Sequence, residues 1–416
     1  MARRKKSSAD RPDTDVLNRG FDPRLSVGSA RPAVFRSSTY VFRSPESAER
    51  AFAVALGKAD RVAGEDVDLI YGRISHPNAE ILEDQVVPLE PGGKAAAVFN
   101  TGMAAIATLL LTVLRPGDAL VFTAPIYGGT HLLLHQLIAP LGIRAIGVPA
   151  GDGTAMARAL RSTRRLRLVL VETPANPTLT MTDIARTVAA ARKRKDPPLV
   201  AVDNTFLGPV FQHPLALGAD LALYSATKYL AGFSDMLGGL LIGRDAALIR
   251  QVKGTRTMLG TILQPDECWL LDGRLATVSL RINRQSKNAA RIVEGLRGHP
   301  RVARIHYPTC FEDAEQKRIY RAQCAFPGGV FSIEVKGGKP AAFDFLRRLR
   351  LVKDAVSLGG VESLACHPAS TTHSEMTPAE REASGVTPSL VRVSVGIEDW
   401  RDLLADIRQA LEGAGG

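Results

Sequence analysis

The sequence predicts an α/β protein built on a parallel sheet with helices on both faces. Between about residues 94 and 250, short apolar runs suited to buried strands take turns with segments of helical periodicity. The 416-residue chain is 45% hydrophobic and 23% charged, which is ordinary for packed globular proteins and unlike disordered chains. Beyond residue 265 the pattern changes, which predicts a smaller α/β unit at the C-terminus.

The strands and helices of the first sheet are predicted from these runs. The expected strands are 95–99, 119–123, 144–148, 166–171, 199–202, 221–224 and 240–242. The expected helices are 103–114, 130–141, 155–161 and 182–193. Thr182 is the predicted N-cap of the last helix, because a hydroxyl there can accept a bond from a free backbone N–H.

The remainder of the chain divides into an arm and a C-terminal unit. Apolar residues recur at helical spacing over 266–296, which predicts one long bridging helix. Further strands are expected at 302–307, 330–335 and 391–395, and helices at 340–349 and 400–411. We therefore expect an N-terminal arm (1–65, its first twelve or so residues disordered), a large domain (66–265) and a small domain (266–416).

The charge of the chain is basic. It has 53 Lys and Arg against 42 Asp and Glu, a formal net charge of +11, with a cluster at Arg3, Arg4, Lys5 and Lys6. Nucleic-acid binding predicts a continuous basic face interleaved with aromatic residues, and aromatic residues are only 6% of this chain. We interpret the charge as solvated surface and expect no nucleic-acid partner.

Cysteines and apolar runs indicate the compartment. The four cysteines form no CxxC pair, which favours a reducing compartment, the cytoplasm, and no metal site. His131 and His135 could imitate a metal pair but have no third ligand nearby in sequence. The longest apolar run, 103–114, is shorter than the roughly 20 residues of a membrane span, so no membrane association is expected.

Lys228 is the most informative residue. It follows the strand 221–224 in the segment Ser225-Ala-Thr227-Lys228 and precedes a glycine-rich turn. A lysine at the exit of a buried strand, beside two hydroxyls that can bind phosphate, is where a pyridoxal-phosphate (PLP) enzyme places its Schiff-base lysine. Many lysines follow strands, so this segment alone leaves the assignment open.

Two further strand ends support the cofactor. Asp203 ends the strand 199–202, where a carboxylate can keep a pyridine nitrogen protonated; the alternative is an Asp that caps a turn. Gly102 opens the helix after the strand 95–99, and a helix N-terminus with a glycine can bind a phosphate; the alternative is an ordinary turn.

Eight segments follow one another along the chain in a characteristic order. They are Tyr71-Gly-Arg73, Thr101-Gly102-Met103-Ala-Ala, Tyr127-Gly-Gly-Thr130, Glu172-Thr-Pro-Ala-Asn176-Pro-Thr, Asp203-Asn-Thr, Ser225-Ala-Thr-Lys228, Ser357-Leu-Gly-Gly-Val-Glu-Ser-Leu and Arg392-Val-Ser-Val-Gly-Ile-Glu398. Together they resemble a known family, the cysteine/methionine-metabolism PLP enzymes. That family comprises cystathionine γ-synthases, cystathionine γ- and β-lyases, methionine γ-lyases and homoserine-ester sulfhydrylases.

The resemblance implies a fold, a cofactor and an assembly. The fold would be aspartate-aminotransferase-like (fold type I), and the cofactor pyridoxal 5′-phosphate. Lys228 would hold the cofactor, Asp203 its pyridine nitrogen, and Tyr127 would stack on its ring. The enzyme would be a homodimer or homotetramer whose active sites are shared between subunits.

The resemblance also implies the remaining roles. The phosphate would contact Gly102, Met103, Ser225 and Thr227, and Tyr71 and Arg73 would reach the neighbouring subunit's phosphate. Asn176 would lie near the 3′-oxygen, and Arg392 with Ser357 would bind the substrate carboxylate, since a guanidinium can bond both oxygens. Catalytic roles are implied for Lys228, Tyr127 and Tyr71.

The expected activity is that of a carbon–sulfur lyase acting on a sulfur amino acid of the cystathionine or methionine type by β- or γ-elimination. A γ-replacement synthase is the alternative, because both reactions share the same carbanion chemistry. A regulatory protein that has lost catalysis is a third reading, which Lys228, Asp203 and Arg392 disfavour.

Substrate choice rests on departures from the family pattern. Cystathionine γ-lyases and γ-synthases commonly carry Glu where this chain has Val356. An apolar residue there indicates a substrate whose far end has no ammonium, or one whose ammonium is bound elsewhere. Methionine γ-lyases typically have a Cys soon after the stacking tyrosine, where this chain has Gly128 and Gly129. The stretch 56–66 is longer than expected and could reshape the substrate entrance.

Overall fold

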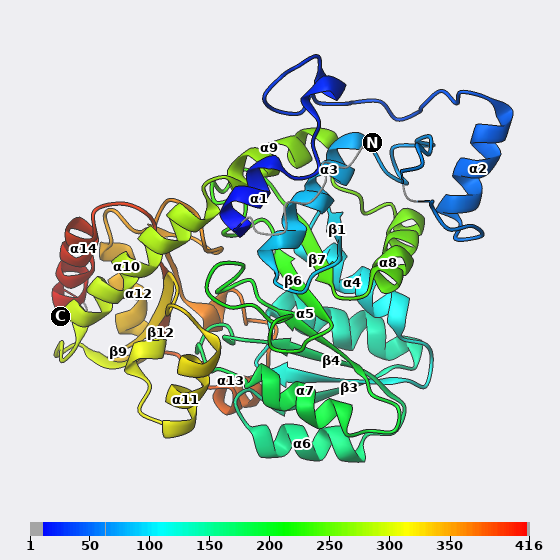
Figure 1. Ribbon diagram of the computed structural model, residues 1–416. Helices are drawn as coiled ribbons and strands as arrows, with labels where there is room; N and C mark the ends of the chain where they lie inside the picture. The colour runs from blue at the N-terminus through cyan, green and yellow to red at the C-terminus, as the bar shows by residue number, and fades with distance from the viewer. Residues whose placement is uncertain (1–10, 63, 414–416) are drawn as a thin grey trace.

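The computed structural model describes residues 11–62 and 64–413 (Figure 1). The basic cluster at Arg3 to Lys6 lies outside these ranges. So do the first ten of the twelve or so residues predicted to be disordered, and at the next two, Arg11 and Pro12, helix α1 (Pro12–Asn18) begins. No helix of the described ranges is both long and apolar enough to cross a membrane.

The first sheet has seven strands in the order β1-β7-β6-β5-β4-β2-β3. Their bounds are β1 Ala95–Phe99, β2 Ala119–Ala124, β3 Arg144–Pro149, β4 Leu166–Glu172, β5 Leu199–Asp203, β6 Leu221–Ser225 and β7 Gly239–Gly243. All seven predicted strands are present. The predicted sheet, mainly parallel, is confirmed: of its seven strands only β7 runs in the opposite direction, antiparallel to its neighbours β1 and β6. The segment 226–238 before β7 holds no helix to make the crossover that a parallel strand needs.

Helices cover both faces of this sheet (Figure 1). One face packs on α4 (Gly102–Val113) and α8 (Ala246–Leu259), and the other on α6 (Gly153–Ser162) and α7 (Ile184–Arg192). The predicted helix 130–141 consists of α5 (Gly128–Leu132), a π turn (Leu133–Ile138) and a 3₁₀ turn (Ala139–Leu141).

The N-cap of α7 is Asp183, so the predicted Thr182 cap is wrong by one residue. The Asp183 side chain accepts a hydrogen bond from the backbone N–H of Arg186 at 2.8 Å. The Thr182 hydroxyl instead accepts a bond from the N–H of Gly151 at 3.2 Å, which ties it to another loop.

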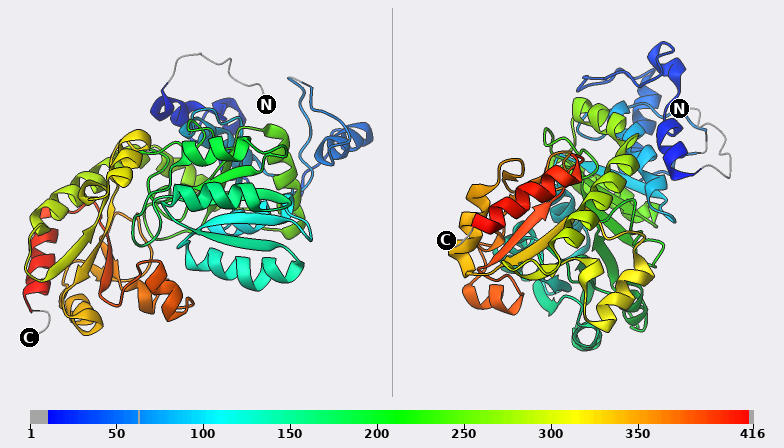
Figure 2. Two further views of the ribbon diagram at one scale, coloured as in Figure 1. Left: turned by 90° about the horizontal axis from the view of Figure 1, so that it is seen from below. Right: turned by 90° about the vertical axis from the view of Figure 1, so that its left-hand side faces the viewer.

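The second sheet lies beside the first (Figure 2) and has the order β10-β11-β12-β9-β8. Its strands are β8 Val302–His306, β9 Val330–Val335, β10 Lys353–Asp354, β11 Leu364–Cys366 and β12 Leu390–Ser394. Its helices are α11 (Ala314–Gln323), α12 (Gly338–Arg348), α13 (Pro378–Ala383) and α14 (Trp400–Gly413).

The predicted bridging helix 266–296 is two helices, α9 (Pro265–Leu275) and α10 (Val278–Leu296). The break falls at Ala276 and Thr277, where the Thr277 hydroxyl accepts a bond from Arg281 Nε at 3.1 Å. The periodic apolar pattern continues through this break, which is why periodicity alone predicted one helix.

The arm contains more regular structure than predicted. Besides α1 it holds α2 (Pro45–Ala55), which projects from the body of the molecule at the upper right of Figure 1. Ser44 begins α2 with a reciprocal pair of hydrogen bonds to Ser47. The chain returns from α2 through the long stretch 56–66, which the Arg50–Glu65 ion pair fastens to the helix at 2.7 Å. Helix α3 (Pro77–Val86) follows.

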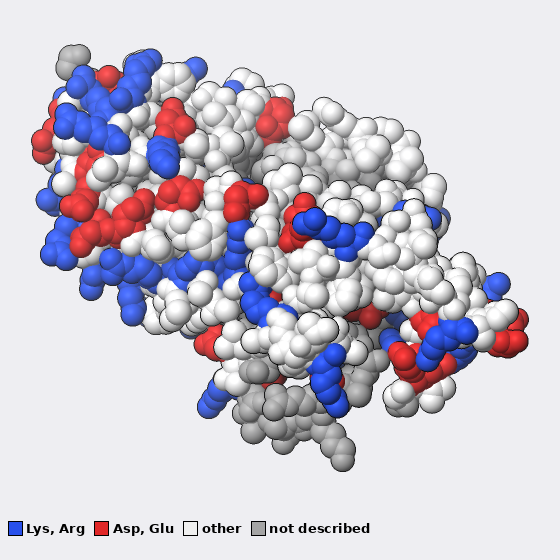
Figure 3. Space-filling view, turned by 90° about the horizontal axis from the view of Figure 1, so that it is seen from above, with Lys and Arg blue, Asp and Glu red and all other residues white. Residues whose placement is uncertain are grey.

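Charged side chains of both signs lie interspersed on the face seen from above, and broad parts of that face carry neither (Figure 3). Many basic residues are ion-paired, for example Arg36 with Asp266 at 2.6 Å. Much of the basic charge of the described residues is therefore divided among local ion pairs.

Candidate active site

Lys228 lies just beyond β6 and is half-buried. Its Nζ donates a hydrogen bond to Ser357 Oγ at 2.9 Å, which joins the two sheets at this point. Burial, and then the positive charge of Arg392, lower the pKa of the Lys228 amine to about 8. An amine with that pKa is neutral far more often at neutral pH than an exposed lysine, so it can act as a nucleophile or base.

Arg392 lies on β12 and is buried. Its Nη1 donates to Asn176 Oδ1 at 3.0 Å, and its Nη2 donates to the Ser357 carbonyl at 2.8 Å. Ser357 has a φ of 95°, in the left-handed region that few residues other than glycine adopt. These partners are neutral, and within the described ranges no carboxylate forms an ion pair with Arg392. A buried guanidinium in this state is suited to an incoming carboxylate.

Asp203 is the last residue of β5. Its Oδ1 accepts hydrogen bonds from the backbone N–H and the hydroxyl of Thr205, at 3.1 and 2.6 Å. Burial raises the pKa of the Asp203 carboxyl, and in the part of the chain that is described no cationic side chain pairs with it. A partly buried carboxylate without a cationic partner fits a protonated pyridine nitrogen.

The structure brings Gly102 and Ser225 together. A Cβ on Gly102 would lie 3.0 Å from Ser225 Cβ, so the N-terminus of α4 touches the end of β6 only because residue 102 is glycine. Met103 lies in the first turn of the same helix. The Thr227 hydroxyl accepts a bond from Gly238 N–H at 3.0 Å, in the turn before β7. The N–H groups at the N-terminus of α4 and the Ser225 and Thr227 hydroxyls are groups of the kind that bind a phosphate.

Tyr127 begins α5, and 43% of its surface is exposed. Tyr71 and Arg73 lie elsewhere, beside α8: Arg73 Nη1 donates to the Thr257 carbonyl at 2.6 Å. Within the described ranges no hydrogen bond or ring contact joins Tyr71 or Arg73 to Lys228. A single chain thus assembles the other predicted site residues and leaves these two outside.

Glu172 is a site residue that the sequence reasoning did not select. It ends β4 directly beside Asp203, its register partner on β5, and it is buried. Its carboxylate accepts hydrogen bonds from the backbone N–H groups of Tyr127 and Asn176. Its place at the carboxyl end of a strand, like that of Asp203, is the signal that could have identified it.

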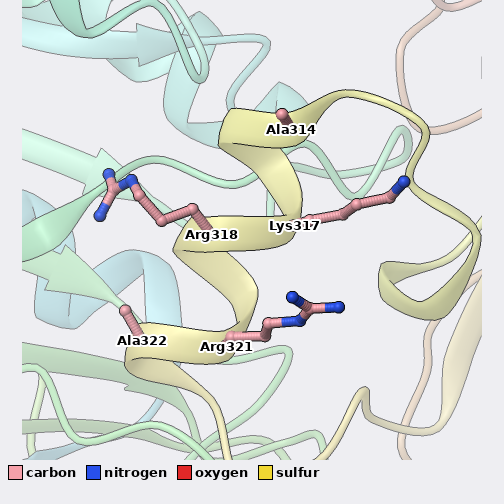
Figure 4. Close-up of a pocket in the computed structure, with 5 residues that line it drawn as sticks. All are labelled: Ala314, Lys317, Arg318, Arg321 and Ala322. Atoms are coloured by element: carbon pink, nitrogen blue, oxygen red, sulfur yellow. The ribbon is translucent and has the colours of Figure 1, made fainter.

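Two other clusters contain none of the predicted site residues. A hollow on α11 is lined by Ala314, Lys317, Arg318, Arg321 and Ala322 (Figure 4). The His131 and His135 rings, in the helical segment that follows Tyr127, are tilted by 45° with their centres 4.4 Å apart. In the described ranges no three potential ligands gather as a metal site would require.

The partly buried Lys228 and Asp203 and the buried Arg392 fit a PLP-dependent enzyme of fold type I, the class to which the relatives of this chain belong. A family model described as "Cys/Met metabolism PLP-dependent enzyme" matches residues 13–412. The chain belongs to this family, and its cofactor is pyridoxal 5′-phosphate.

Known proteins are similar to this chain in sequence and structure over nearly its full length. The L-methionine gamma-lyase of Pseudomonas putida is 40% identical over 400 residues, 96% of each chain. A cystathionine gamma lyase from Micromonospora echinospora has a similar structure, with a TM-score of 0.87 and 38% identity over 98% of this chain and 100% of that one. A cystathionine gamma synthase from Xanthomonas oryzae pv. oryzae gives a TM-score of 0.88 and 35% identity, covering 97% and 98%. The predicted class, a PLP-dependent carbon–sulfur lyase of the trans-sulfuration type, is confirmed.

Proposed function

We propose that the protein cleaves a carbon–sulfur bond in an amino acid whose sulfur side chain ends without charge, as methionine does. The observation that carries this proposal is Val356, which precedes Ser357 and is 53% exposed. An ammonium group held beside this apolar side chain would lose hydration without gaining a partner. Similarity to L-methionine gamma-lyases supports the same choice.

The remaining residues have proposed roles in this reaction. Bound PLP supplies an electron-withdrawing ring that accepts the electron pair left at the substrate Cα. Lys228 would hold the cofactor and, once released, move the Cα proton, while Asp203 keeps the pyridine nitrogen protonated. Tyr127 would stack on the ring, and Tyr127 or Tyr71 would protonate the leaving sulfur. Gly102, Met103, Ser225 and Thr227 would bind the phosphate.

Substrate assays test the proposal. The purified protein would be incubated with methionine, with cystathionine, and with an O-acyl homoserine plus a thiol, and 2-oxo acid and thioether would be measured. We expect 2-oxo acid, ammonia and thiol, formed most efficiently from methionine. Thioether as the main product would favour the γ-replacement alternative.

Val356→Glu is expected to raise the preference for cystathionine over methionine by about tenfold, because a carboxylate there would pair with the distal ammonium. The ratio of the two kcat/KM values measures this effect. Leu141→Glu places the same charge on an exposed residue outside the site and should leave the ratio unchanged. An unchanged ratio in both variants would remove Val356 from the specificity site.

Arg392→Ala is expected to weaken binding of the substrate carboxylate. A hydrogen-bonded contact to a charged group contributes about 1.5 to 3 kcal/mol, so KM should rise roughly 10- to 150-fold while kcat changes less. Steady-state kinetics with the cofactor saturated separates the two effects. A fall in kcat with KM unchanged would contradict the assignment of Arg392 to the carboxylate.

We propose a homodimer or homotetramer in which Tyr71 and Arg73 complete the partner's phosphate site. Tyr71 is 42% exposed, and the Arg73 guanidinium lies 5.9 Å from its ring, away from Lys228 of the same chain. The projecting α2 and the exposed Met258 near Thr257 offer surface for a partner.

We also propose the division of the chain into an arm and two domains, with boundaries at residues 65 and 265. A cytoplasmic location is proposed as well, and the four free thiols support it.

Mixing subunits tests the shared site. Arg73→Ala and Lys228→Ala homo-oligomers should each be inactive. Hybrids made by refolding the two together should regain up to about a quarter of wild-type activity, since one site in half of the dimers holds both native residues. A fully active monomer, or hybrids with no activity, would exclude the arrangement.

A further inference from the structure

Glu172 links the loops that carry two predicted cofactor contacts. Its Oε2 accepts a hydrogen bond from the backbone N–H of Tyr127 at 2.8 Å, and its Oε1 accepts one from the N–H of Asn176 at 2.9 Å. Tyr127 follows the end of β2, and Asn176 follows the end of β4. One buried carboxylate therefore fixes two separate segments of irregular backbone.

The main chain of Glu172 strengthens this link. Its N–H donates to the Thr123 hydroxyl on β2 at 2.9 Å, so the ends of β2 and β4 are held together from both sides. Asn176 in turn accepts a bond from Arg392. The position of the Tyr127 ring, the Asn176 amide and the Arg392 guanidinium thus depends on one side chain. Bonds from N–H groups to a carboxylate are among the stronger hydrogen bonds in proteins.

Charged groups around Glu172 come from neighbouring elements. Asp203 on β5 is its register partner, and Arg392 reaches it from β12. His373 contacts the same segment, with Nε2 3.1 Å from the Asn176 carbonyl. Burial, and then the negative charge of Asp203, raise the pKa of the Glu172 carboxyl, whereas the two N–H donors and Arg392 act in the opposite direction and favour the carboxylate.

We propose that Glu172 is a positioning residue for the cofactor, which holds Tyr127 against the ring and Asn176 beside the 3′-oxygen. This inference rests on the proposed roles of Tyr127 and Asn176. Glu172 itself touches neither substrate nor cofactor in this arrangement, so its effect passes through the two backbone N–H groups.

Glu172→Gln tests the proposal, because an amide has one acceptor oxygen where the carboxylate has two. One buried N–H would face an NH₂ group and lose its partner. We expect PLP to bind roughly tenfold more weakly. A tenfold loss of affinity corresponds to about 1.4 kcal/mol, which lies within the free-energy cost of an unpaired buried donor. The pH midpoint of the visible absorption band should move upward, because a displaced Asn176 no longer stabilises the anionic 3′-oxygen. Equilibrium dialysis and a spectroscopic pH titration measure these effects without turnover.

Asp406→Asn is the matched control. Asp406 is also buried, and it accepts bonds from the backbone N–H groups of Arg350, Leu351 and Val352 at 2.9 to 3.0 Å, beside the second sheet. This variant should lose thermal stability, with its PLP affinity and spectrum unchanged. Glu172→Asp retains the carboxylate and should recover part of the affinity and the midpoint, and it replaces Glu172→Gln if that variant does not fold.

Each outcome decides a separate question. If a folded Glu172→Gln or Glu172→Asp protein has wild-type PLP affinity and an unshifted midpoint, and loses only thermal stability as Asp406→Asn does, the proposal is overturned. Tyr127→Ala and Asn176→Ala test the roles on which this inference rests. If both variants bind PLP as tightly as the wild-type protein does, the proposed roles of Tyr127 and Asn176 are wrong, and the inference about Glu172 is wrong with them.

Discussion

Lys228→Ala is expected to abolish covalent attachment of PLP and to lower turnover by several orders of magnitude. The lysine amine is the partly buried nucleophile proposed for the site, with Ser357 as its hydrogen-bond partner. Loss of proton transfer by this amine alone accounts for roughly 10²- to 10⁴-fold, and loss of attachment adds to it. Absorption spectra after dialysis and single-turnover assays measure the two effects.

The control for this variant is Lys317→Ala, which removes an exposed lysine from α11 (Figure 4). It should retain both the visible band and the activity. A Lys228→Ala protein that still turned over substrate at a rate near that of wild type would show that another amine performs these steps.

Asp203→Ala is expected to reduce turnover by several orders of magnitude even where PLP remains bound. Without the carboxylate the pyridine nitrogen loses its proton, and the ring becomes a weaker acceptor for the electron pair at Cα. Single-turnover measurement of Cα proton exchange with solvent should show the defect directly, because this exchange requires no loss of sulfur.

Asp220→Asn is a suitable comparison for Asp203→Ala. Asp220 directly precedes β6 and lies beside the start of β5, at the end of that strand opposite to Asp203. Its carboxylate accepts a bond from the Val200 N–H at 2.7 Å and pairs with Arg192. The comparison variant should lose some stability and keep its rate of exchange. Near-normal exchange in Asp203→Ala with bound cofactor would assign the pyridine nitrogen to a different residue.

Much of the fold was predictable because it depends on local signals. All seven apolar runs of the first sheet are strands, since their apolar residues can be buried only in a sheet covered on both faces. The direction of β7 was not predictable from its own residues, because it depends on the absence of a crossover helix after β6. Helix α11 was missed because its residues are mainly polar and only Ile319 is buried.

The site residues differ in the same way: some follow from local sequence signals, and others depend on contacts that only the folded chain makes. Lys228 and Asp203 could be selected because each follows a recognisable buried strand. Glu172 also ends a strand, but its proposed role depends on backbone N–H groups of two separate loops. Every residue except proline has such a group, so the sequence does not indicate which of them Glu172 would bind. Tyr71 and Arg73 could be selected only by resemblance, and their proposed function depends on a second chain.

We propose that Lys228 is the residue that holds PLP. Borohydride reduction of the holoenzyme, followed by proteolysis and mass spectrometry, tests this role, because reduction fixes the cofactor to the amine that binds it. We expect a single modified peptide that contains Lys228. A modified peptide from another lysine, or no modified peptide from protein that has bound PLP, would contradict it.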